Sequence, residues 1–134
     1  MSAMAEHPPQ RFERQLVAQP RAFARVRRAV ASQLRLWGRA DLVPGAAMCV
    51  TELLSNVHKH TATAECVLTI DNLPGGIRAA VSDADAGMPT VKEPDYFAES
   101  GRGMFLLSET ADTWGVDLNS TGKTVWFKLE TGGR

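Results

Sequence analysis

Near its centre the sequence reads Val50-Thr51-Glu52-Leu53-Leu54-Ser55-Asn56-Val57-His58-Lys59-His60, and the rest of the chain can be arranged around this segment. At 3.6 residues per turn the segment predicts a helix with two unlike sides. The apolar side carries Val50, Leu53, Leu54 and Val57. The polar side carries Glu52, Asn56, Lys59 and His60. The side-chain oxygens of such a row could hold Mg²⁺, and its cationic groups could face phosphate oxygens, so the row suits a Mg²⁺–phosphate site. A solvated helix surface explains this segment alone equally well.

The bulk composition indicates one domain of 134 residues, long enough to bury a core without cross-links. Lys plus Arg and Asp plus Glu number 15 each, so the zero net charge argues against a general nucleic-acid binder. No apolar run approaches about 18 residues and no signal-peptide pattern occurs, so we expect a cytoplasmic protein without membrane contact. Cys49 and Cys66 lie in apolar runs without metal-ligand spacing, which favours buried reduced thiols.

Apolar periodicity and turn signals predict three helices and about five strands. Residues 1–9 are expected to be a disordered tail and residues 10–131 a single domain. The predicted helices lie at residues 20–37, 41–59 and 103–111, and the predicted strands at residues 11–17, 65–71, 77–83, 113–118 and 124–130. Residues 87–100 are predicted to form a loop. A mixed, mostly antiparallel sheet with helices on one face gives an α+β fold, a two-layer sandwich.

The first predicted helix has a basic outer side, formed by Arg21, Arg25, Arg28 and Arg35. Most basic helix surfaces are simply solvated, which is the plainer interpretation here. The alternative is a docking surface for an acidic partner.

Two further segments carry polar or glycine residues where binding chemistry could reside. Asp83 ends an apolar strand, and its carboxylate could accept a hydrogen bond from an exocyclic amine such as that of adenine. Gly87 would let the backbone approach the flat base closely. Gly101-Arg102-Gly103 open a predicted helix, whose free N–H groups favour an anion such as phosphate. Each segment alone also fits an ordinary turn or helix entry, and the Walker A and GxGxxG patterns are absent.

Together, and in this order, the three segments resemble the N, G1 and G2 boxes of the GHKL ATPases, which share the Bergerat fold. Gly122-Lys123-Thr124-Val125-Trp126-Phe127 resembles the last motif of that family, whose threonine lies near the adenine site. Phe23-Ala24-Arg25-Val26 and Glu52-Leu53-x-x-Asn56 resemble the stand-alone anti-sigma factor serine kinases of the RsbW and SpoIIAB type. The resemblance covers roughly residues 12–129.

This resemblance implies roles for particular residues. Asn56 matches the Mg²⁺ ligand, and Glu52 matches the base that activates the attacking hydroxyl. Arg25 matches an arginine on the partner-binding helix. The matches to ATP-binding positions are Asn56, Lys59, His60, Asp83, Gly87, Gly101, Arg102, Gly103 and Thr124. Two positions depart from the family pattern, because Asp85 and Thr61 stand where the family usually has glycine. Neither change removes a proposed ligand, so the departures affect the expected catalytic activity more than the expected nucleotide binding.

The resemblance also implies partners and an activity. The expected protein binds Mg·ATP, sequesters a sigma factor and phosphorylates an anti-anti-sigma protein with a STAS domain on Ser or Thr. Such proteins often form homodimers, so a second copy is a further expected partner. Three alternatives stay open at this point: a nucleotide-dependent binding switch without kinase activity, a histidine-kinase ATPase domain cut from a longer chain, and an α+β interaction domain without nucleotide.

Overall fold

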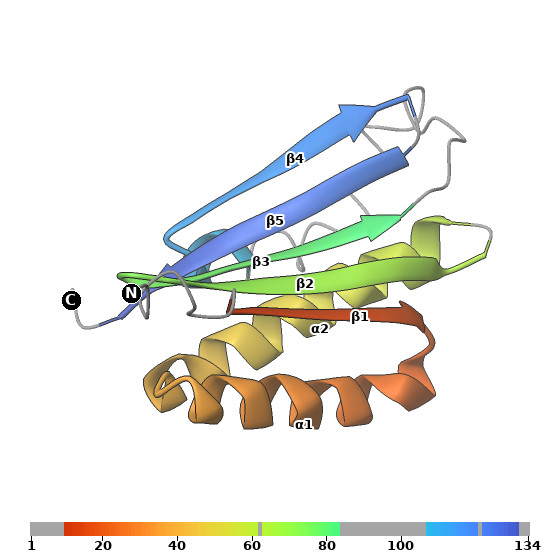
Figure 1. Cartoon of the computed structure of the whole chain (residues 1–134). Coiled ribbons are helices and arrows are strands. Elements are labelled where there is room, and N and C mark those ends of the chain that lie inside the picture. The colour runs from red at the N-terminus through yellow and green to blue at the C-terminus, as the bar shows by residue number, and fades with distance from the viewer. Residues whose placement is uncertain (1–9, 62, 84–106, 121, 132–134) are drawn as a thin grey trace, which may run out of the picture.

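The computed structural model describes residues 10–61, 63–83, 107–120 and 122–131 (Figure 1). Its helical elements are α1 (Pro20–Leu36), the short 3-10 helix η2 (Ala40–Leu42) and α2 (Val43–His60). Residues 107–110 are also helical. The strands are β1 (Arg11–Val17), β2 (Glu65–Leu73), β3 (Gly76–Asp83), β4 (Thr113–Asn119) and β5 (Gly122–Glu130).

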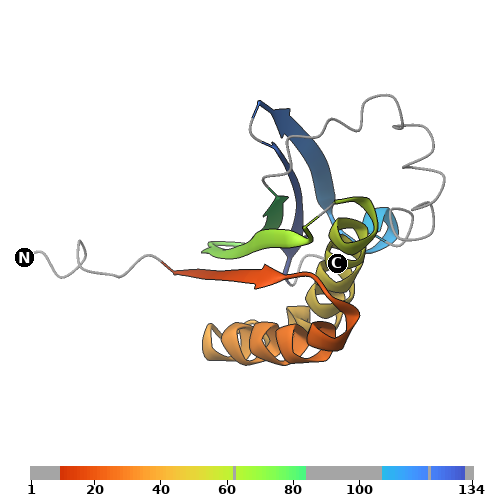
Figure 2. The same ribbon diagram turned by 90° about the vertical axis from the view of Figure 1, so that its right-hand side faces the viewer.

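The five strands form one sheet in the order β1-β2-β3-β5-β4, and all four neighbouring pairs are antiparallel. Both long helices lie against the same face of this sheet (Figures 1 and 2). The predicted α+β two-layer architecture is therefore confirmed. The other face carries no helix among the described residues.

α1 begins and ends as its sequence predicts. Pro20 opens the helix, where its missing N–H and fixed φ are tolerated. Val26, Val30 and Leu34 recur at helical spacing and are buried. Gly38 follows with a φ of 76°, a left-handed conformation that glycine adopts without strain, and its N–H donates to the Arg35 carbonyl at 3.0 Å.

The core lies between α2 and the sheet. α2 contributes Ala46, Cys49, Val50, Leu53, Leu54 and Val57, all buried. The facing strands contribute Leu68, Ile70, Ala79, Val81, Val125 and Phe127. Burying each large apolar side chain contributes about 1.5–3 kcal/mol, so this interface holds α2 firmly against β3 and β5.

Several predicted boundaries shift by one or two residues, and some predictions fall outside the described ranges. β2 and β3 run closer to their turn than predicted, with Leu73 paired to Gly76. The tail at residues 1–9, the loop at residues 87–100 and the start of the third helix lie outside the described residues. None of the helices in the described ranges combines the length and apolar character that a membrane span requires.

Candidate functional site

α2 places the predicted polar residues at the edge of its buried side. At about 100° per residue, Asn56 lies about 40° from Glu52 and about 60° from Leu53 around the helix axis. Asn56 is 4% exposed, whereas Glu52 is half-buried. The sequence analysis put Asn56 on a polar side away from the core, so its deep burial is a difference that the structure introduces. The carboxamide of Asn56 is therefore a buried polar group of α2 rather than a surface group.

Lys59 and His60, the two basic residues predicted to face phosphate, differ in exposure at the last turn of α2. His60 is half-buried and Lys59 is exposed. His58, Lys59 and His60 together place basic groups at the helix C-terminus, where they complement the helix dipole. This structural role accounts for Lys59 without a ligand, while His60 lies closer to the buried side.

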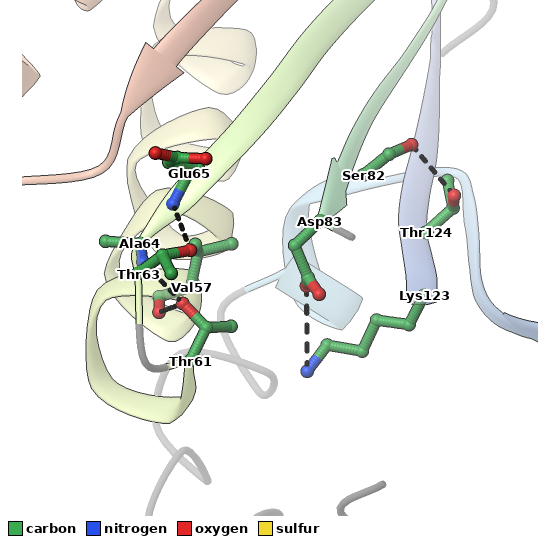
Figure 3. A network of polar contacts seen from close by, with 9 residues as sticks. All are labelled: Val57, Thr61, Thr63, Ala64, Glu65, Ser82, Asp83, Lys123 and Thr124. Carbon is green, nitrogen blue, oxygen red and sulfur yellow. Dashed lines mark hydrogen bonds and ion pairs between the residues drawn. The ribbon is translucent and has the colours of Figure 1, made fainter. Parts of the chain in front are cut away.

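Thr61, which stands where the family usually has glycine, caps α2. Its Oγ1 donates to the Val57 carbonyl at 2.8 Å and accepts a hydrogen bond from the Ala64 N–H at 3.0 Å (Figure 3). Thr61 itself has an extended backbone, and the left-handed conformation falls on Ala64, with a φ of 60°. The turn after α2 is therefore closed by a side chain and not by a glycine.

Asp83 lies at the same end of the sheet as this turn. The short link after α2 leads into β2, and Cys66, the second residue of β2, pairs with Asp83 on β3. Asp83 is 6% exposed and alternates with the buried Ala79 and Val81, so it points toward the helix layer. Within the described ranges, Asn56 and Asp83 are the buried polar residues.

Lys123 shares the helix-facing side with Asp83. The two residues pair across β3 and β5, and Lys123 Nζ lies 3.9 Å from Asp83 Oδ2. Both side chains are shielded, at 12% exposure for Lys123 and 3% for Asp83. Sequence reasoning did not single out Lys123. The signal was available, because Val125, Phe127 and Leu129 alternate as apolar residues along the strand and Lys123 has the same parity.

Thr124 lies on the opposite face of the sheet. Its Oγ1 is 2.8 Å from Ser82 Oγ, and Figure 3 shows this pair on one side of β3 and β5 and the Asp83–Lys123 pair on the other. The side chains of Thr124 and Asp83 therefore point to opposite faces of the sheet, although both residues line the cavity described below. The role of Thr124 near adenine is what the resemblance implies.

The two cysteine thiols of the chain lie near the proposed site residues and are unreactive. Cys49 and Cys66 are free and buried, which confirms the prediction. Burial raises the pKa of Cys49 to about 12, with a smaller contribution from Glu52. Burial likewise raises the pKa of Cys66 to about 12, and Asp83 adds to it. Both thiols therefore stay protonated at neutral pH, which argues against nucleophilic or metal-binding roles.

The remaining predicted residues divide into two groups. Gly87, Gly101, Arg102 and Gly103 lie outside the described residues, as does Asp85. Arg25 lies on α1, where it is exposed while the adjacent Val26 is buried, so its side chain faces outward as predicted.

A cavity of about 700 Å³ lies at the end of the sheet that carries Asp83 and Lys123. The described residues that line it come from the five strands, and α2 contributes none. Its lining includes Ser82 and Thr124 from the helix-free face as well as Asp83 and Lys123. The cavity therefore adjoins the Asp83–Lys123 pair without reaching Glu52 or Asn56.

Comparison with known proteins points to one family. Residues 16–129 match the histidine kinase-like ATPase domain. No curated protein matches the chain. Among solved structures, the crystal structure of the RsbU and RsbW domains of Rv1364c from Mycobacterium tuberculosis is similar, with a TM-score of 0.66 and 16% sequence identity. The similarity covers 90% of this chain and 32% of that one, so this chain spans about a third of the length of the chain in that structure.

Proposed function

The chain belongs to the histidine kinase-like ATPase domain family, and from this membership we propose that it binds Mg·ATP between α2 and the sheet end that carries Asp83. The observation that supports this most directly is burial. The buried polar residues of the described chain, Asn56 and Asp83, are the two that the sequence assigned to the metal and to adenine. Ligand sites are lined mostly by apolar groups with a few placed polar side chains, and these two buried polar residues would supply such side chains.

The donor chemistry fits Mg²⁺ held mainly by nucleotide phosphates. No group of three or more His, Cys, Asp or Glu residues that could hold a metal occurs in the described ranges. The side-chain oxygen of Asn56 is a hard ligand of the kind Mg²⁺ prefers, and Mg²⁺ is commonly held by one or two protein oxygens plus phosphates. Asn56 would therefore hold the ion, which when bound neutralises phosphate charge.

We further propose that the protein is an anti-sigma factor that phosphorylates an anti-anti-sigma protein with a STAS domain. In this reaction Glu52 accepts the proton of the attacking Ser or Thr hydroxyl. The hydroxyl oxygen bonds to the γ-phosphorus, the bond from that phosphorus to the bridging oxygen breaks, and ADP leaves. Such transfer depends on positioning and charge neutralisation, so a half-buried carboxylate one turn from Asn56 is a suitable base.

Partner binding is proposed to use the outer side of α1. Arg25 is exposed there, beside further exposed arginines at positions 21, 28 and 35. A guanidinium can bind a carboxylate through two parallel hydrogen bonds, so this surface suits an acidic region of the sigma factor or its antagonist. A second copy of the chain is a further proposed partner.

The test combines binding and transfer. Calorimetry with ATP, with and without Mg²⁺, should show Mg²⁺-dependent binding, and its absence would favour an interaction domain without nucleotide. Incubation with γ-labelled ATP and a candidate STAS protein should label that protein on Ser or Thr. ATP binding without transfer to a verified partner would instead indicate a nucleotide-dependent binding switch. Labelling of a histidine on a partner would indicate histidine-kinase chemistry.

A further inference from the structure

The inward-facing ammonium of Lys123 is a feature that the proposed function leaves unexplained. Lys123 belongs to the same inward row of β5 as Val125 and Phe127, which are core residues. A lysine side chain at 12% exposure is costly unless a charge partner is present, and the carboxylate of Asp83 is such a partner. Lys123 therefore stands beside the acid that is proposed to read the base.

The two side chains have opposite and fixed hydrogen-bonding characters. An ionised carboxylate only accepts hydrogen bonds and an ammonium only donates them. Their nearest charged atoms are 3.9 Å apart, which is beyond hydrogen-bonding distance, so the pair can present an acceptor and a donor side by side. A ligand that bridges them needs a donor and an acceptor on neighbouring atoms. Adenine has this pair, because its exocyclic amine donates and the adjacent ring nitrogen N1 accepts.

We propose that Lys123 is a specificity-determining residue that donates a hydrogen bond to N1 of the adenine ring while Asp83 accepts from the exocyclic amine. This inference rests on the proposed binding of ATP at this seam. A guanine in the same position would place its O6 acceptor against the carboxylate and its N1–H donor against the ammonium. Both contacts would then be mismatched, whereas a hydroxyl in place of Lys123 could reorient and tolerate either base.

A simpler role must be distinguished from this one. Lys123 could serve only to neutralise Asp83, in which case its removal would weaken every nucleotide that depends on an ionised Asp83. A contact with N1 instead predicts that the loss depends on whether the base has a nitrogen at that ring position. The comparison of ATP with 1-deaza-ATP, in which a C–H replaces N1, separates the two roles.

The experiment is a double cycle of protein and ligand changes measured by calorimetry. The proteins are the wild type, Lys123→Met and Lys128→Met, and the ligands are Mg·ATP and Mg·1-deaza-ATP. Lys128 lies on the same strand with the opposite parity, so its substitution is a matched control on the other face. Thermal melts without nucleotide confirm that each variant is folded.

The wild type and Lys128→Met should bind ATP about tenfold or more tightly than 1-deaza-ATP, as expected for a hydrogen bond to a charged donor. Lys123→Met should bind the two nucleotides with nearly equal affinity. A wild-type ratio near one, or a ratio that Lys123→Met leaves unchanged, would overturn the inference while ATP binding itself stands. The ratio of the ATP and 1-deaza-ATP affinities of the wild type tests the inference by itself, even if Lys123→Met fails to fold. Absence of ATP binding by the wild type would instead overturn the proposed function, and the inference with it.

Discussion

Replacing Asp83 by asparagine tests the proposed base-reading acid against a purely structural role. The substitution keeps the size of the side chain and one oxygen acceptor, but it removes the negative charge. The affected carboxylate is 3% exposed and lies 3.9 Å from the Lys123 ammonium. Two consequences follow, one on stability and one on nucleotide binding, and they can be measured separately.

The stability effect comes from Lys123 losing its counter-charge. Unit charges 3.9 Å apart attract by about 4 kcal/mol at an effective dielectric constant near 20, but desolvation of both groups offsets most of that attraction. Breaking a fully buried pair typically costs about 3–5 kcal/mol. Because Lys123 retains 12% exposure, we expect a smaller loss of about 1–3 kcal/mol in the free energy of unfolding. For a domain of this size that lowers Tm by roughly 3–10 °C.

The binding effect concerns the adenine amine. A hydrogen bond to a charged acceptor is worth about 1.5–3 kcal/mol, so ATP affinity should fall by roughly 10- to 100-fold. The asparagine amide can donate to the O6 of guanine, so the preference for ATP over GTP should shrink further. Calorimetry well below the mutant's Tm measures both affinities.

The matched control is Asp71→Asn, which breaks the exposed ion pair with Arg11 on β1, whose atoms lie 2.6 Å apart. Exposed pairs contribute little, so this variant should change neither Tm nor nucleotide affinity appreciably. The reasoning fails if Asp83→Asn keeps the wild-type affinity and base preference while its Tm falls. Asp83 would then be a structural partner of Lys123 and nothing more.

Three further substitutions test the other proposed roles. Asn56→Ala should lower the Tm of the nucleotide-free protein because a buried amide is lost, and should also abolish the extra thermal shift that Mg²⁺ adds to ATP; an unchanged Mg²⁺-dependent shift would exclude the metal role. Glu52→Gln should bind ATP normally yet slow phosphoryl transfer to the STAS partner by about 10²–10⁴-fold, and transfer at the wild-type rate would remove Glu52 from the mechanism. Arg25→Ala should melt and bind ATP like the wild type but lose about 2 kcal/mol or more in affinity for the sigma factor or the STAS protein by calorimetry. Equal partner affinities would place the docking surface elsewhere.

The sequence predicted the fold well because its elements carry strong local signals. Pro20, the spacing of Val26, Val30 and Leu34, and Gly38 together define α1 to within one residue. The short segment with Pro74, Gly75 and Gly76 at the turn from β2 to β3 likewise favours an antiparallel hairpin, and the two strands pair in this way from Cys66 to Leu73. The ends of these strands at the turn were predicted too short. In the structure the pairing continues to the last residues before the tight turn, whatever their strand propensity.

The site was predicted less completely, because burial of a polar residue depends on tertiary packing. A helical wheel places Asn56 at the border between the two sides of α2, so its position on the helix alone does not decide that it is buried. The cap formed by Thr61 was not predicted either. Its hydroxyl closes the turn after α2 by a hydrogen bond, at a position where the family motif usually has glycine. The residue with a positive φ in this turn is Ala64.

Strand register determines which residue of β5 stands beside Asp83. The core pairs Ala79 with Phe127 and Val81 with Val125, and these pairs fix β3 and β5 relative to one another. With that register, Asp83 faces Lys123 on the helix side, and Ser82 faces Thr124 on the other side. A slip of one residue would exchange the two faces, exposing Phe127 and burying Trp126, and the loss of core packing prevents it. The burial of Phe127, more than the glycine-containing motif before it, therefore makes Lys123 the neighbour of the proposed adenine-reading acid.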